Sequence, residues 1–175
     1  MADIPVTAQQ LEEIATGFHG QAEKHFAANG RVIPALWFIP DTGPARLVTM
    51  PNGVVDREQT AQIARTEQPA AILLAGESWL GSVTIPAEAA KQLPLGDIPR
   101  PSEQPERREV ISTFGVGRRP DGGLLHVARA TLVLRTVFGA QLVPFGLDPD
   151  AEREDDYAAS LASLLPGGKK QRRRR

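Results

Sequence analysis

Hydrophobic and polar residues follow two different periods along this chain, and the period switches several times between helix-like and strand-like. Apolar residues recur at i, i+3 and i+4 spacing from Leu11 to Phe26, which predicts an amphipathic helix over residues 8–28. Thr7 and Gln10 form a capping-box pattern at its start. We therefore expect one face of this helix to be buried and the opposite face to be polar.

Shorter apolar runs separated by turn residues predict strands. In order, the pattern predicts a hairpin of strands at 34–39 and 45–50, a helix at 57–68 capped by Asp56, a central strand at 70–80, strands at 107–117 and 124–135, and a helix at 149–165. Residues 136–147 are ambiguous and leave open one more short strand at 140–145.

The resulting order, α-β-β-α-β-β-β-α, predicts an α+β fold with a mostly antiparallel five-stranded sheet and flanking helices. We expect a single domain over residues 1–166, interrupted by a long proline-rich loop at 83–106. Residues 167–175 lack any apolar side chain and predict a disordered basic tail.

The element order resembles that of the roadblock and longin-like modules, in topology alone. The central strand ends in Glu77-Ser78-Trp79, and Arg107-Arg108-Glu109 opens the next strand. These two triplets, over a stretch of about residues 30–135, are similar to those of an uncharacterised family of small bacterial and phage proteins. The resemblance implies an α+β fold and carries no assigned activity.

Composition narrows the classes of function. The 175 residues include no cysteine, which excludes disulfides, thiolate zinc sites and cysteine nucleophiles. The N-terminus lacks the basic and apolar regions of a signal peptide, and no apolar run approaches the ~20 residues that span a bilayer. We expect a soluble, cytoplasmic protein with no membrane partner.

The sequence offers no motif for a metal or a phosphate cofactor. His19 and His25 are separated by about 240° on a helix, so they cannot share a ligand face. No His-Glu-x-x-His spacing, dinucleotide fingerprint or Walker loop is present. We therefore predict neither a metal site nor a cofactor.

Three residues are candidates for general acid–base chemistry: Glu77, Glu109 and His126. The two carboxylates lie on strands that we expect to be neighbours, and a carboxyl group buried near another can have a raised pKa. The simpler interpretation is a cross-strand ion pair between Glu77 and one of three arginines: Arg108, Arg129 or Arg135.

Charge is strongly segregated along the chain. Six of the 20 basic residues lie in the last seven positions: Lys169, Lys170, Arg172, Arg173, Arg174 and Arg175. The first 168 residues hold the other 14 basic residues and all 21 acidic ones, so their net charge is −7. The tail could stay solvated, bind a polyanion such as nucleic acid, or fold back on the acidic segment 148–156.

These features favour a non-enzymatic protein-interaction module. Its sheet edge or first helix would contact a protein partner or a second copy of the chain, and its basic arm would contact a polyanion. The alternative is a small hydrolase or transferase that uses carboxylate general acid–base chemistry at Glu77.

Overall fold

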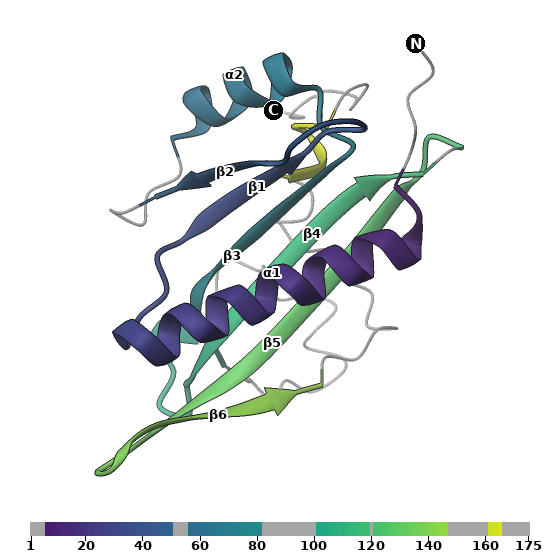
Figure 1. Cartoon of the computed structure of the whole chain (residues 1–175). Helices are drawn as coiled ribbons and strands as arrows, with labels where there is room; N and C mark the ends of the chain where they lie inside the picture. The colour runs from purple at the N-terminus through teal and green to yellow at the C-terminus, as the bar shows by residue number, and fades with distance from the viewer. Residues whose placement is uncertain (1–5, 51–55, 82–100, 120, 147–160, 166–175) are drawn as a thin grey trace, which may run out of the picture.

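A computed structural model describes residues 6–50, 56–81, 101–119, 121–146 and 161–165 of the chain. Its elements are α1 (Ala8–Asn29), β1 (Ala35–Ile39), β2 (Arg46–Thr49), α2 (Arg57–Glu67), β3 (Ala71–Leu80), the short 3-10 helix η2 (Pro101–Glu103), β4 (Arg108–Arg118), β5 (Leu124–Thr136) and β6 (Gly139–Phe145). The strands form one antiparallel sheet in the order β2-β1-β3-β4-β5-β6 (Figure 1).

The α+β class and the antiparallel sheet are confirmed, but the prediction of five strands is wrong. The sixth strand, β6, covers the region that the sequence left ambiguous and pairs with β5 from Ala130 to Thr136. Its pattern is hard to recognise because it is an edge strand with most residues exposed and a proline at position 144. Two residues, Val137 and Phe138, make the turn between the strands.

The remaining boundaries agree closely with the predictions, within the residues that the structure describes. The capping box at Thr7 and Gln10 is present, and Gly30 ends α1 in the left-handed conformation, with φ of 71°. Inside the predicted loop 83–106, residues 101–103 form η2. Of the predicted last helix, 149–165, only residues 161–165 are described. The predicted basic tail, 167–175, lies outside the described residues.

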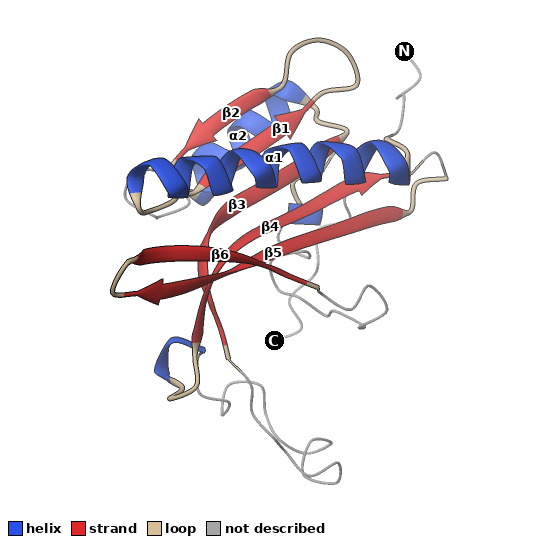
Figure 2. Ribbon diagram, turned by 60° about the horizontal axis from the view of Figure 1, so that its bottom comes forward, coloured by secondary structure: helices blue, strands red, loops and turns tan. Residues whose placement is uncertain are grey.

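Helix α1 lies across one face of the sheet, over β3, β4 and β5 (Figure 1). Figure 2 shows α1 and α2 on opposite sides of the sheet. The residues that it buries there follow helical spacing: Leu11, Ala15, Phe18, His19, Ala22 and Phe26. The ring of Phe18 meets that of Trp37 on β1, with centroids 4.9 Å apart. At β4, Gly115 packs so closely that an added Cβ would lie 2.7 Å from a methyl group of Val127.

The opposite face of the sheet carries a second core. Ile63 and Ala64 of α2 and the leucines at 161 and 165 pack there with residues of β1, β3 and β4: Leu36, Phe38, Ile72 and Val116. A central sheet that is buried on both faces explains why β3 begins as a continuous apolar run.

Candidate functional site

The two predicted carboxylates lie on neighbouring strands and on the same face of the sheet, but each has its own partner. Glu109 is directly opposite Trp79 in the β3–β4 register, two positions from Glu77. The Glu109 carboxylate accepts two hydrogen bonds from the Arg135 guanidinium, at 2.7 and 2.6 Å. That contact and the charge of Glu109 raise the pKa of Arg135.

Glu77 contacts the backbone and not an arginine side chain in its hydrogen bond to Val32. Its carboxylate accepts a hydrogen bond from the backbone N–H of Val32, in the segment that links α1 to β1. Glu77 therefore fastens the end of the α1 connection to the central strand. Beside it, Trp79 is 45 % exposed, and the Arg107 guanidinium lies 5.2 Å from the centroid of its ring.

His126 lies apart from both carboxylates. It pairs with Val116, while Glu77 pairs with Ile111, so the two positions are about 17 Å apart along β4. Alternation along the strands also places His126 on the opposite face of the sheet. The structure thus does not bring Glu77, Glu109 and His126 together around one reacting atom.

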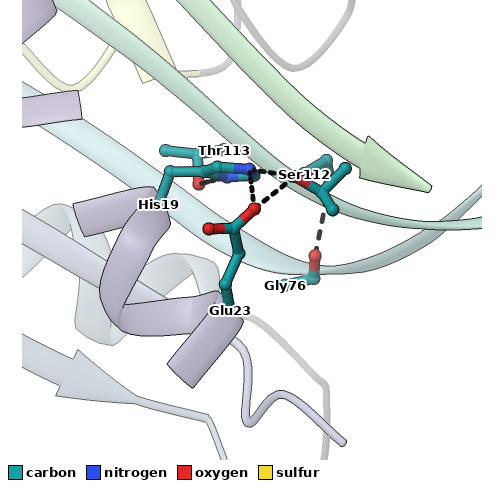
Figure 3. A network of polar contacts seen from close by, with 6 residues as sticks. His19, Glu23, Gly76, Ser112 and Thr113 are labelled. Carbon is teal, nitrogen blue, oxygen red and sulfur yellow. Dashed lines mark hydrogen bonds and ion pairs between the residues drawn. The ribbon is translucent and has the colours of Figure 1, made fainter. Parts of the chain in front are cut away.

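A buried polar network lies instead between α1 and the sheet. The two ring nitrogens of His19 are each 2.9 Å from a threonine hydroxyl, Nδ1 from Thr113 on β4 and Nε2 from Thr131 on β5. Glu23, one turn further along α1, accepts a hydrogen bond from Thr131. Figure 3 shows His19 and Glu23 reaching from the helix toward the sheet, with Thr113 beside the imidazole.

These contacts indicate which tautomer the neutral imidazole of His19 adopts. The Thr131 hydroxyl has a single proton, which it donates to Glu23, so its oxygen must accept from Nε2–H of His19. In the neutral imidazole, which burial favours, Nδ1 is then the acceptor for the Thr113 hydroxyl. Burial lowers the pKa of His19 from its ordinary value of 6.5; Glu23 acts against this shift and Arg129 adds to it.

This network suits a structural role more than a catalytic one. His19 is 7 % exposed and Thr113 is fully buried, so no substrate reaches the imidazole. The surrounding charges, Arg129 and Glu12, also form an ion pair with each other. The network therefore helps to fix the register of α1 on β4 and β5.

The other polar side chains near these residues form ordinary structural contacts. Nδ1 of His25 donates to the carbonyl oxygen of Arg31, 2.9 Å away. On the other face of the sheet, the hydroxyls of Ser78 and Ser112 are 2.9 Å apart, and Ser112 also contacts the Gly76 carbonyl (Figure 3). Among the residues that the structure describes, no group of three or more His, Cys, Asp or Glu could hold a metal ion.

Among the described residues, the most exposed large apolar side chains lie at the end of the β5–β6 hairpin, which projects beyond the neighbouring strands (Figure 1). Val137 and Phe138 in its turn are 94 % and 98 % exposed. Leu134 and Val143, diagonal neighbours on the two strands, are 44 % and 38 % exposed. We call these four residues the apolar hairpin end; the other exposed large apolar residues of the described chain, Leu47 and Trp79, lie elsewhere on the sheet.

The turn that carries this surface is well ordered by its own contacts. The Thr136 hydroxyl donates to the Gly139 carbonyl at 2.8 Å and accepts from the Phe138 N–H at 3.2 Å. Gly139 has a φ of 121°, which a residue with a side chain rarely adopts. The Val-Phe pair is therefore presented on a defined turn.

The hydrophobic pattern of the sequence does not predict this surface, although the distribution of charge along the chain contains a signal for it. Between Asp121 and Asp148 there is no acidic residue, and Arg129 and Arg135 are the only arginines. An acid-free stretch within a body of charge −7 is unusual enough to notice. The pattern alone could not show that Val137 and Phe138 form a turn at the sheet edge, because the existence of β6 was itself uncertain.

Comparisons with known proteins leave the function to be argued from the structure. Neither protein-family models, nor curated proteins, nor solved structures gave a match to this chain. Among the described helices, none is both long and apolar enough to cross a membrane.

Proposed function

We propose that this protein is a non-enzymatic interaction module that meets a protein partner through the apolar hairpin end, while its basic C-terminal arm contacts a polyanion such as nucleic acid. The observation that carries the proposal is the nearly complete exposure of Val137 and Phe138. Folded proteins commonly expose single apolar residues, whereas here two apolar residues adjacent in the chain are both almost fully exposed, and exposed apolar patches often mark interaction sites.

The exposed aromatic side chain of Phe138 favours a protein partner. An aromatic side chain removes about 150–250 Å² from water when it is fully buried, and aromatic residues are common anchors in interfaces. Phe138 is available for this role because it has almost no contact with its own chain. The absence of acidic residues from the hairpin lets a partner approach without repulsion from the acidic body.

The alternative, general acid–base catalysis at Glu77, has less support. Glu109, which would assist Glu77, is already paired with Arg135. His126 lies on the opposite face of the sheet. The Glu77 carboxylate accepts a hydrogen bond from the backbone N–H of Val32 in the loop between α1 and β1, and this structural role is enough to explain its presence.

Photo-crosslinking tests the hairpin directly. A benzophenone amino acid is placed at Phe138 of the full-length chain and irradiated in the cells that make the protein naturally. We expect a discrete crosslinked product from position 138 and none from the same amino acid at Ala28, an exposed position on α1. Equal crosslinking from both positions, or none from 138, would contradict the proposal.

The basic arm needs its own test. A gel-shift titration compares the full chain with a 1–168 truncation on single- and double-stranded nucleic acid. If all six cations contact phosphates, log affinity should fall with log salt with a slope of about −4 to −5, and the truncation should remove the binding. Equal and salt-insensitive behaviour of both forms would remove the arm from the proposed function.

A further inference from the structure

The β6 strand is an open edge of the sheet. It is the last strand in the order, and among the described residues it pairs with β5 alone. Because a two-residue turn joins Thr136 to Gly139, and hydrogen-bonded pairs alternate along an antiparallel hairpin, positions 140, 142 and 144 direct their backbone groups away from β5. Pro144 occupies one of these outward positions, where a proline leaves the ladder to β5 intact.

The apolar hairpin end continues this open edge. Val137 and Phe138 directly precede β6, and Val143 lies within it. An exposed edge with large apolar side chains is a template for pairing with another strand, and folded proteins usually protect such edges with charges. Here the stretch between Asp121 and Asp148 has no carboxylate at all.

The distribution of charge indicates which molecule supplies the strand that pairs with β6. In each copy residues 1–168 carry a net charge of −7, so repulsion opposes the approach of these two bodies, and a surface without carboxylates lessens it. The acid-free hairpin is where two copies can approach with the least repulsion. An edge strand can also pair with itself around a two-fold axis, which closes the assembly at two subunits.

We propose that the partner of the apolar hairpin end is a second copy of the chain, joined by antiparallel pairing of β6 with β6. The inference rests on the proposed function, since it names the partner of the same surface. The pairing that avoids Pro144 places Ala140 opposite the partner's Leu142, with Gln141 on the two-fold axis. This uses the outward N–H and C=O groups of both residues in each copy.

The same register covers the exposed side chains. Phe138 then lies beside the partner's Pro144, and Val137 lies beside the partner's Phe145. Val143 comes opposite the partner's Gly139, which has no side chain to obstruct it. Shifting the register to put Leu142 on the axis would instead set Ala140 against the partner's Pro144, which has no N–H to donate.

The interface is small, and its strength follows from its size. The paired segment runs from Val137 to Phe145, far fewer than the roughly 20–30 residues a side of a standard stable interface. We therefore expect reversible dimers with a dissociation constant in the micromolar range or weaker, so that the dimer fraction rises with protein concentration.

Sedimentation equilibrium of the full chain, from about 10 μM to about 1 mM, tests the proposal. We expect the mass to rise from 18.9 kDa toward twice that value. Ala140→Pro removes an outward N–H in the way that Pro144 already does, and Phe138→Ser removes the aromatic side chain. Each should raise the dissociation constant at least tenfold. Leu47→Ser on β2, an exposed apolar residue at the opposite edge, should leave it unchanged.

Several outcomes would overturn the second copy as partner. A monomer mass over the whole range would do so, as would a loss of association in Leu47→Ser equal to that in Ala140→Pro. If Ala140→Pro alters the circular dichroism spectrum, Phe138→Ser decides, because residue 138 has almost no contacts to lose within one copy. A monomer that still crosslinks from position 138 to a different protein would refute self-pairing and leave the proposed function standing.

Discussion

The His19 network predicts a measurable energetic coupling between α1 and the sheet. Thr113→Val keeps the shape of the side chain but removes the hydroxyl that donates to Nδ1 of His19. Thr113 is fully buried, so the imidazole nitrogen is left without a donor and without access to water. Leaving such a group unsatisfied costs about 1–3 kcal/mol, and we expect the free energy of unfolding to fall by that amount.

Removing the histidine instead of the threonine should lower the free energy of unfolding by a similar amount, because the other member of the hydrogen bond is then left unpaired. His19→Leu leaves the Thr113 hydroxyl unpaired, whereas Thr131 keeps its bond to Glu23. We expect a loss of about 1–3 kcal/mol from this variant too. The double variant removes both members of the bond, so its loss should be smaller than the sum of the two by about 0.5–3 kcal/mol.

Urea unfolding followed by tryptophan fluorescence measures this cycle. Trp37 contacts Phe18 on α1, so its emission reports the separation of the helix from the sheet. Thr16→Val, on the exposed side of α1, is the matched control and should change stability by less than about 0.5 kcal/mol. Additive losses in the double variant, or a neutral Thr113→Val, would refute the account of the network.

Three further predictions follow from named contacts. Burial lowers the pKa of His19 in the folded chain, so just below pH 6.5 the unfolded chain binds more protons than the folded one. The contribution of His19 to the free energy of unfolding should therefore be complete above pH 6.5 and should fall as the pH is lowered below that value. Urea unfolding at a series of pH values measures this dependence, and His19→Gln should make it flatter. Gly115→Ala should lower stability by about 1–3 kcal/mol in thermal or urea unfolding, since its Cβ would lie 2.7 Å from Val127 and 3.0 Å from Leu73, and an unchanged midpoint would show that β4 is less tightly packed than described. Phe138→Ser should leave the free energy of unfolding of the monomer within about 0.5 kcal/mol, measured in dilute solution, and a larger loss would mean that the side chain packs within its own chain.

Much of the fold follows from local signals in the sequence. The helix α1 and its capping box come directly from apolar spacing and from Thr7 with Gln10, because both depend on residues within one turn of each other. The pairing of β3 with β4, which brings Glu109 near Glu77, was also foreseen from the order of the strands. Such features need little knowledge of the rest of the chain.

The parts that were missed depend on contacts between distant segments. The role of His19 requires Thr113 and Thr131, which lie about a hundred positions away and have no helical or strand spacing with it. The strand β6 is weakly patterned because only one of its edges is paired and most of its side chains meet solvent. Without β6, the exposure of Phe138 could not be deduced.

The central claim is that Phe138 is exposed in the isolated chain and covered by a protein in the assembled state. Fluorine NMR of a single 4-fluorophenylalanine at position 138 tests this most directly, with a soluble paramagnetic agent as the probe of exposure. We predict strong broadening in dilute solution and protection from it as protein concentration increases, with protection lost in Ala140→Pro. A signal that stays equally exposed at every concentration, and in a concentrated extract of the cells that make the protein, would contradict the claim.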